Sequence, residues 1–127
     1  MPRATQITVS LKSKTGVLAQ LAKTLADARV NIASLSADAV SGRGKIRLIV
    51  NKAGDAKRAL RRAKYRFSEE PAFIVRLRNK PGSLARVAGR LAKARVNIKS
   101  AYATTAGRGA AIVFTVGSVA KARKVLR

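Results

Sequence analysis

Two stretches of the chain alternate apolar and polar side chains, and apolar positions at helical spacing follow each of them. Residues 6–12, QITVSLK, and residues 72–78, AFIVRLR, have the period of two that is typical of a half-buried strand. Residues 18–28 and 84–94 then place Leu, Val and Ala on one helical face. A turn, SKTG or NKPG, joins strand to helix in each case. The pattern therefore predicts the same strand–turn–helix segment twice.

The second half of the chain repeats the pattern of the first half at an offset of 66 residues. The best-matching positions are Leu11, Gly16, Leu18, Leu25, Val30, Asn31, Ile32 and Ser34, which meet Leu77, Gly82, Leu84, Leu91, Val96, Asn97, Ile98 and Ser100. We therefore predict two domains, residues 1–71 and residues 72–127.

Each repeat continues with further strands and a second helix. In the first repeat, RVNIASLSADAV and KIRLIV flank the glycine turn SGRG and predict a hairpin. DAKRALRRAKY then predicts a short helix, and YRFSEEP a fourth strand that ends at Pro71. The order β-α-β-β-α-β is the ferredoxin-like pattern. The predicted fold class is α+β, with two ferredoxin-like repeats whose antiparallel sheets carry their helices on one face.

The second repeat stops after its second helix, VAKARKVLR, and so lacks a fourth strand. In this topology the missing strand would lie beside residues 72–78, where backbone groups would be left unpaired. We expect a neighbouring chain or the other repeat to cover that edge.

Charge widens the range of possible partners. The chain has 28 Lys and Arg against 5 Asp and Glu, a net charge of +23, which attracts polyanions such as nucleic acid or an acidic protein. A lineage-wide bias toward basic surface residues would give the same composition, and the sequence leaves both explanations open.

Residue content argues against catalysis. The chain has no Cys and no His, which removes disulfides, the commonest zinc ligands and the usual general base near neutral pH. The five carboxylates form no recognisable catalytic pair. We expect no enzymatic activity, no metal and no cofactor.

Targeting signals are not evident in the sequence. The first ten residues, MPRATQITVS, lack the apolar core of a signal peptide, and no apolar run approaches the roughly 20 residues of a membrane span. We expect a cytoplasmic protein without a membrane partner.

The turn, the helix phase and the V-N-I that follows resemble the ACT domain family in both repeats. The segment NKPGSLARVAGRLAKARVNI is a good match, and KSKTGVLAQLAKTLADARVNI is a looser one. The resemblance covers nearly the whole chain as two tandem copies. ACT domains are regulatory modules without catalysis of their own, and they typically bind free amino acids or related small ligands at an interface between two such domains.

The resemblance implies a ligand site at the turn between the first strand and the first helix, completed by an Asn that opens the second strand. The implied ligand-binding residues are Ser13, Lys14, Thr15, Gly16 and Asn31 in the first repeat and Asn79, Lys80, Pro81, Gly82 and Asn97 in the second. A turn that opens a helix offers free N–H groups and a positive dipole end to a carboxylate. Plain turn glycines, and asparagines that only cap the strand entry, are the structural alternatives.

The two implied sites depart from the family pattern in different ways. The first repeat has Ser13 and Thr15 where the second has Asn79 and Pro81. Cations surround both turns, namely Lys12, Lys14, Arg78 and Lys80. An anionic ligand, or one with an extra carboxylate or phosphate, therefore becomes more plausible than a neutral amino acid.

Sequence-independent nucleic-acid or polyanion binding is the alternative function. Its candidate residues lie on the open sheet face or along the second repeat's first helix: Lys45, Arg47, Arg76, Arg78, Arg86, Arg90 and Lys93. RNA-recognition domains of the same topology stack bases on aromatics, but KIRLIV has none and Phe114 falls on the helix-facing side. A scaffold module whose charge only aids solubility is the third possibility.

We favour a non-catalytic regulatory protein that binds a small molecule, an amino acid or related carboxylate, between ACT-like units. A homodimer is expected, because it would complete both sheets and sites.

Overall fold

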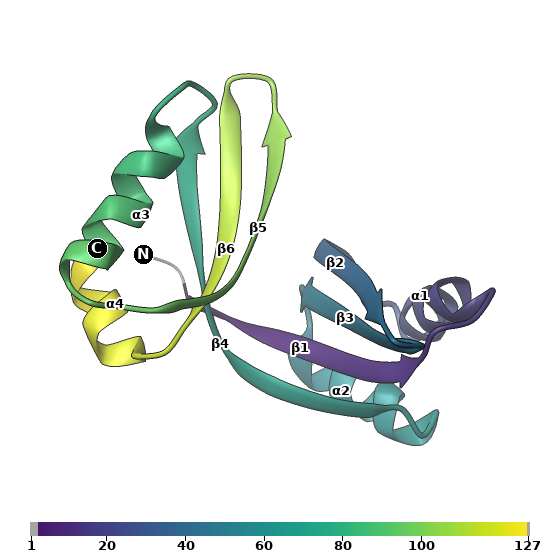
Figure 1. Cartoon of the computed structure of the whole chain (residues 1–127). Helices are drawn as coiled ribbons and strands as arrows, with labels where there is room; N and C mark the ends of the chain where they lie inside the picture. The colour runs from purple at the N-terminus through teal and green to yellow at the C-terminus, as the bar shows by residue number, and fades with distance from the viewer. Residues whose placement is uncertain (1–2, 127) are drawn as a thin grey trace. The chain divides into compact units, whose positions relative to one another are not determined.

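The computed structural model describes residues 3–126, apart from the side chains of residues 105 and 106. The elements in chain order are β1 (Arg3–Lys12), α1 (Val17–Asp27), β2 (Ile32–Val40), β3 (Arg43–Val50), α2 (Ala53–Arg62), β4 (Arg66–Arg78), α3 (Ser83–Lys93), β5 (Ile98–Ala106), β6 (Gly109–Val116) and α4 (Val119–Val125) (Figure 1). They form two compact units. The N-terminal unit is residues 5–70, and the C-terminal unit is residues 71–126 with residues 3–4.

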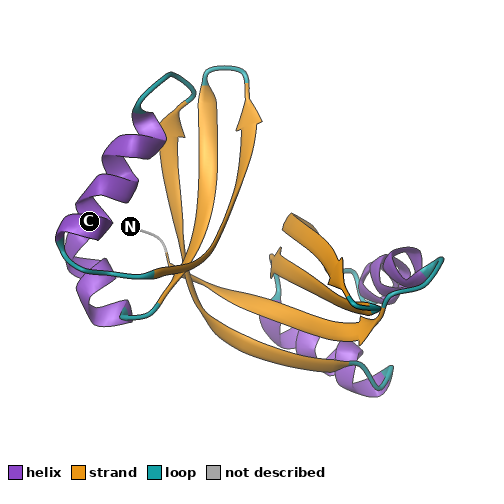
Figure 2. Ribbon diagram, viewed as in Figure 1, coloured by secondary structure: helices purple, strands orange, loops and turns teal. Residues whose placement is uncertain are grey.

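The N-terminal unit has the strand order β2-β3-β1-β4. Its β1 and β3 are antiparallel, with a register from Ile7 opposite Leu48 to Lys12 opposite Arg43. The helices α1 and α2 cover one face of these strands (Figure 2). The core between helices and sheet consists of Ile7, Val9, Leu21, Leu25, Val30, Ile46, Leu48, Ala56 and Leu60. These are the apolar positions whose spacing predicted strands and helices.

The C-terminal unit repeats this plan with the order β1-β4-β6-β5 and with α3 and α4 on one face. Its β4 and β6 are antiparallel, from Phe73 opposite Phe114 to Arg78 opposite Gly109. A second, separate core consists of Phe73, Val75, Val87, Leu91, Val96, Ile112, Phe114, Val116, Ala122 and Leu126. The predicted fold class, with antiparallel sheets and helices on one face, is therefore confirmed. Phe114 lies in the core, as its parity predicted.

One boundary prediction is wrong. Pro71 does not end the fourth strand, because β4 runs without interruption from Arg66 to Arg78. Proline has no N–H to donate, but its fixed φ is compatible with an extended chain, so a strand can pass through it where no donor is required. The last strand of the first repeat and the first strand of the second are therefore one element.

The C-terminal unit includes the first two described residues of β1. The strand order places β1 next to β4, and residues 3–4 of β1 belong to the C-terminal unit. Residues 3–4 thus take the first place in the ferredoxin-like strand order 4-1-3-2 of that unit. The expectation that a neighbouring chain or the other repeat covers that edge stays a prediction.

Candidate ligand-binding site

The first candidate loop opens α1 through a left-handed glycine. Ser13, Lys14, Thr15 and Gly16 are exposed, and Gly16 precedes the helix with a φ of 88°. No side chain caps the first turn of α1, and that turn carries no acidic residue. The amide of Val17 donates to the carbonyl oxygen of Lys14 at 3.3 Å, and the next amides, which have no partner within the helix, are presented to solvent or to a ligand.

The second candidate loop, Asn79–Gly82, has the same backbone. Gly82 precedes α3 with a φ of 89°, and no side chain caps this helix either. Lys80 and Pro81 are exposed. A Cβ at Gly16 or Gly82 would meet no atom within 4 Å, so the space beside each loop is open.

Each loop is held against the glycine hairpin of its own unit. The amide of Ser13 donates to the carbonyl oxygen of Gly42 at 2.8 Å. The amide of Asn79 donates to the carbonyl oxygen of Arg108 at 2.6 Å, and its Nδ2 donates to that of Gly107 at 3.2 Å. The sequence identified the hairpins as turns but contained no direct sign that they support the loops. The offset of 66, which pairs Gly42 with Arg108, could have suggested it.

A pocket of about 310 Å³ lies beside the first loop. Its lining is mostly apolar and comes from β1, α1, β2 and β3: Leu11, Ser13, Val17, Leu18, Ala37, Asp38, Ala39, Gly44 and Ile46. Ser13 was predicted as a site residue, but its neighbours in this lining were not. Gly44 allows Leu11 to pack closely against the backbone of β3, since a Cβ there would lie 3.0 Å from Leu11 Cδ1.

The predicted asparagines open the second strand of each unit. The amide of Asn31 donates to Asn51 Oδ1 at 2.9 Å, and the amide of Asn51 donates to the carbonyl oxygen of Asn31 at 3.1 Å. In the other unit, Gly117 donates to the carbonyl oxygen of Asn97 at 2.9 Å. Both Asn31 and Asn97 are exposed, and these contacts use their backbone groups.

Within one unit, the asparagine and the loop lie at opposite ends of the sheet. Lys12, beside the loop, pairs with Arg43 at the start of β3, whereas Ile32, beside Asn31, pairs with Val50 at its end. The helix between loop and asparagine has 11 residues and spans about 16 Å. One unit therefore does not bring Asn31 to Gly16, and the same topology separates Asn97 from Gly82.

Exposed apolar side chains lie near these loops and along β2. Leu18 and Leu84, which are equivalent in the repeat, are 42% and 52% exposed although their spacing predicted core positions. On β2, which has a strand neighbour on one side only, Leu35 is 39% exposed and Val40 73%. Leu35 and Val40 are five residues apart in the strand and so point to opposite faces of the sheet, but exposed apolar side chains on an edge strand are suited to contact with another protein surface.

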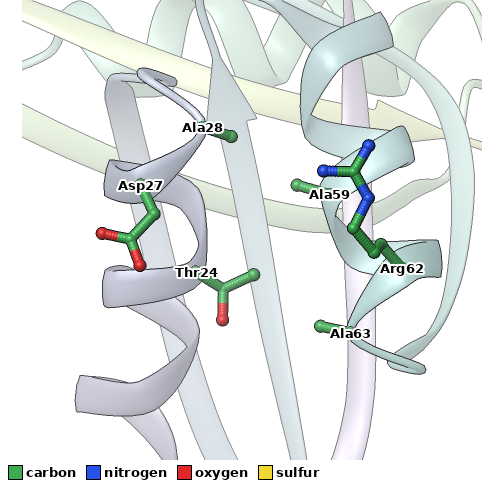
Figure 3. A pocket seen from close by; sticks show the side chains of 6 residues that line it. All are labelled: Thr24, Asp27, Ala28, Ala59, Arg62 and Ala63. Carbon is green, nitrogen blue, oxygen red and sulfur yellow. The ribbon is translucent and has the colours of Figure 1, made fainter.

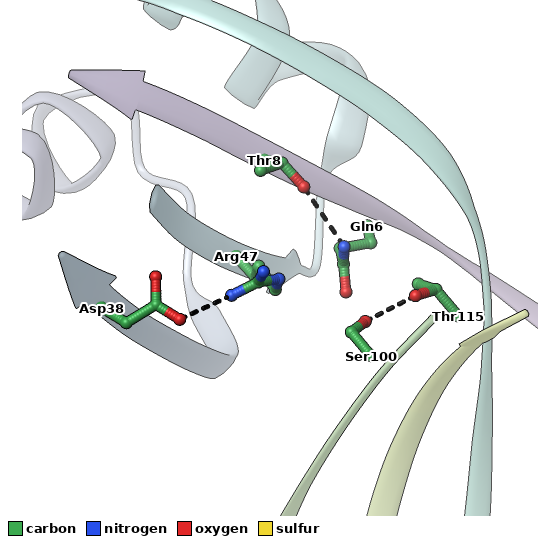
Figure 4. Close-up of polar contacts among 6 residues, drawn as sticks. All are labelled: Gln6, Thr8, Asp38, Arg47, Ser100 and Thr115. Atoms are coloured by element: carbon green, nitrogen blue, oxygen red, sulfur yellow. Dashed lines mark hydrogen bonds and ion pairs between the residues drawn. The ribbon is translucent and has the colours of Figure 1, made fainter. Parts of the chain in front are cut away.

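The sheet face opposite the helices contains buried residues. Gln6, Ile49, Val113 and Thr115 lie on this face and are at most 4% exposed. Figure 4 shows polar contacts there: Gln6 Nε2 donates to Thr8 Oγ1 at 3.2 Å, and the hydroxyls of Ser100 and Thr115 are hydrogen-bonded.

The cations predicted for the alternative function fall into two groups. Lys45, Arg76 and Arg78 are exposed strand residues, and half-buried Arg47 pairs with Asp38 at 3.3 Å (Figure 4). Arg86, Arg90 and Lys93 are exposed on α3. Arg90 also donates a hydrogen bond to the carbonyl oxygen of Val125 at the end of α4.

Residues 3–126 contain neither a metal-binding cluster nor a membrane-spanning helix. Among them, no group of three or more His, Cys, Asp or Glu could hold a metal ion. Within the same residues, no helix combines the length and apolar character needed to cross a membrane.

The comparison with protein families agrees with the repeated architecture. A family model described as an ACT domain pair matches residues 3–127. The chain belongs to this ACT domain pair family. ACT domains are regulatory domains that bind small ligands, so the chain is a tandem ACT protein of regulatory type.

Solved structures of other proteins have the same fold. Protein BT0572 from Bacteroides thetaiotaomicron has a TM-score of 0.92 and 27% identity, over 98% of this chain and 86% of that one. The ligand-free regulatory subunit of aspartate kinase from Thermus thermophilus has a TM-score of 0.71 and 17% identity, over 98% and 88%. The corresponding subunit from Thermus flavus has a TM-score of 0.68 and 14% identity, over 98% and 90%. No curated protein matches this chain.

Proposed function

We propose that this tandem ACT protein is a non-catalytic regulator that binds an amino acid or a related carboxylate between ACT units of two copies of the chain. The observation that carries the proposal is the repeated loop. In both units a left-handed glycine opens a helix that has no side-chain cap, beside open space. Uncapped helix amides and the positive end of the helix dipole suit a carboxylate.

A second copy of the chain would bring an asparagine close to the loop, which a single unit does not do. The edge strand β2 runs from the asparagine end of its unit to the hairpin that holds the loop. If two β2 strands lie side by side and antiparallel, Asn31 of one copy approaches the loop of the other. Such an arrangement also buries Leu35 and Val40, whose exposure supports an interface here. The argument from strand direction applies also to β5, Asn97 and the loop at Gly82, whereas that from exposed Leu35 and Val40 concerns β2 alone.

The charge around the loops favours an anionic ligand. Lys12, Lys14, Arg78 and Lys80 flank the two turns, and all four are exposed. A ligand with a second carboxylate or a phosphate would gain from these cations more than a neutral amino acid, at a cost in salt sensitivity.

A thermal-shift screen tests the proposal. The twenty amino acids and common anionic metabolites are added to the full chain at moderate salt, and a compound that binds only the folded state raises the melting temperature. We expect a hit that Asn97→Ala or Asn31→Ala weakens, because either change removes a polar group from a shared site. Isothermal titration of the hit then measures the loss.

Controls separate the site from general stability. Ser68→Ala, an exposed substitution in β4 outside both loops, should leave the hit unchanged. Sedimentation at rising concentration should detect a dimer that the ligand strengthens. A hit that neither asparagine affects, or a protein that stays monomeric with saturating ligand, would contradict the proposed interface site.

A further inference from the structure

Acidic residues are confined to one half of the chain. All five Asp and Glu lie within residues 27–70, and residues 71–127 hold thirteen Lys and Arg with no Asp or Glu. Ion pairs in the N-terminal unit join Lys23 to Asp27, Arg47 to Asp38, Lys57 to Glu69 and Arg58 to Asp55. Cations of the C-terminal unit, by contrast, have no carboxylate side chain of their own unit to pair with.

Several of these cations line one helix. Arg86, Arg90 and Lys93 follow one another at spacings of four and three, so they share one face of α3. They are exposed, while Val87 and Leu91 of the same helix are buried. The bond from Arg90 to Val125 ties this face to α4, whose Lys121, Arg123 and Lys124 are also exposed.

Each unit has a groove between its two helices, and the two grooves differ in the charge of their lining. In the C-terminal unit a groove of about 320 Å³ is lined by Arg90, Lys93, Ala94 and Val125. The N-terminal unit has a groove of about 260 Å³ at the equivalent place, lined by Thr24, Asp27, Ala28, Ala59, Arg62 and Ala63 (Figure 3). Thr24 and Asp27 are the counterparts of Arg90 and Lys93. The charged residues that line the groove are therefore of both signs in the N-terminal unit and all cationic in the C-terminal unit.

We propose that the cationic face of α3 and α4 binds the phosphate backbone of double-stranded nucleic acid, without sequence preference. Charge complementarity supports this partner, because a row of Arg and Lys without acidic neighbours matches a row of phosphates. Single-stranded nucleic acid would call for aromatic side chains on which bases stack. The aromatic residues of the C-terminal unit are Phe73 and Phe114 in the core and Tyr102 on β5, none of them on this face.

The face also fits a membrane or a protein less well. Insertion into a lipid surface requires an apolar helix face, but on α3 Val87 and Leu91 are buried in the core and Leu84 is the only large apolar side chain that is exposed. Stable protein interfaces centre on exposed aromatic or aliphatic side chains, whereas Arg86, Arg90 and Lys93 expose charged groups.

The salt dependence of duplex binding sets the size of the effect that we expect from removing these cations. Each phosphate contact contributes about 0.9 to the slope of log affinity against log salt on duplex DNA. A face that engages three phosphates through Arg86, Arg90 and Lys93 should therefore lose about 2 to 3 from that slope when all three cations are removed.

Fluorescence anisotropy with a labelled short duplex of mixed sequence tests the proposal over a range of salt. The first variant, R86Q/R90T/K93D, places on α3 the residues that α1 carries at Gln20, Thr24 and Asp27. The matched control, R43T/K52D/R66T, removes the same net charge at exposed sites of the N-terminal unit. We expect the first variant to bind at least about tenfold more weakly with a shallower salt slope, and the control to keep the slope of the parent.

Several outcomes would overturn the proposal. Equal weakening by both triple variants would mean that net charge alone attracts the duplex. Equal competition by polyglutamate would point to any polyanion, and preference for a single strand or for anionic vesicles would point to another partner. If R86Q/R90T/K93D does not fold, R86Q/K93Q keeps the Arg90 bond to Val125 and should still reduce the slope, by about 2. None of these outcomes bears on the small-ligand site, which the thermal-shift screen tests separately.

Discussion

Gly82 and Gly89 belong to the same helix region but serve opposite purposes. Gly82 adopts a φ of 89° just before α3, a conformation that costs other residues energy, whereas Gly89 lies inside α3 with ordinary helical backbone. A Cβ added to either glycine would meet no atom within 4 Å, so packing does not distinguish them. The first glycine shapes the candidate loop, and the second only weakens its helix.

Alanine at these two positions should therefore change stability in opposite directions. Gly82→Ala should lower the free energy of unfolding by about 1 to 2 kcal/mol through left-handed strain. Gly89→Ala should raise it by about 0.5 to 1 kcal/mol, because alanine is the better helix former. Urea denaturation of both variants measures the difference. Two shifts of the same sign would contradict the backbone argument.

At the scale of elements, the second helices of the two units differ in how they begin. Ser118 precedes α4, and its side chain accepts a bond from the amide of Lys121 at 3.3 Å. The equivalent residue before α2 is Lys52, whose side chain makes no such bond. The equivalence follows from the offset of 66 that relates the repeats.

A capping serine added before α2 and the serine removed before α4 should change the free energy of unfolding in opposite directions. Lys52→Ser should raise the free energy of unfolding by about 0.5 to 2 kcal/mol, and Ser118→Lys should lower it by a similar amount. Thermal and urea unfolding of the single variants test this, with the exposed Ser68→Ala as a neutral control. No gain in Lys52→Ser would show that α2 does not need a side-chain cap.

Sequence patterns predicted most of these elements because each has one buried face. The alternation in residues 6–12 and the helical spacing of Leu21 and Leu25 correspond to the observed core. The continuity of β4 through Pro71 was missed, because proline is ordinarily a strand breaker and its tolerance depends on which backbone groups the neighbouring strands require. Exposure of Leu18 was missed because spacing identifies an apolar face but not which end of it the sheet covers.

The candidate site was predictable only in part. The turn glycines followed from the sequence, and their left-handed backbone agrees with the need for glycine there. The support of each loop by a hairpin, and the separation of Asn31 from Gly16, depend on which strand residues pair, and the hydrophobic pattern was used to find the strands but not their register. Their roles in ligand binding stay predictions.

For the whole molecule, duplication explains how one short chain can combine two surfaces. The N-terminal unit keeps all the acidic residues and exposes apolar side chains on its edge strand. The C-terminal unit has no acidic side chain and concentrates cations on α3. With both units belonging to one ACT pair, we expect ligand binding at the loops and duplex binding at the helices to be separable.

The most direct test is to map backbone amide shifts by two-dimensional NMR while the ligand identified in the screen is titrated into the protein. The account predicts the largest shifts at the loop that ends in Gly16 or Gly82, together with the asparagine at the far end of the same kind of unit. Shifts confined to α3 and α4, or to no particular surface, would contradict the claim that these loops bind the regulatory ligand.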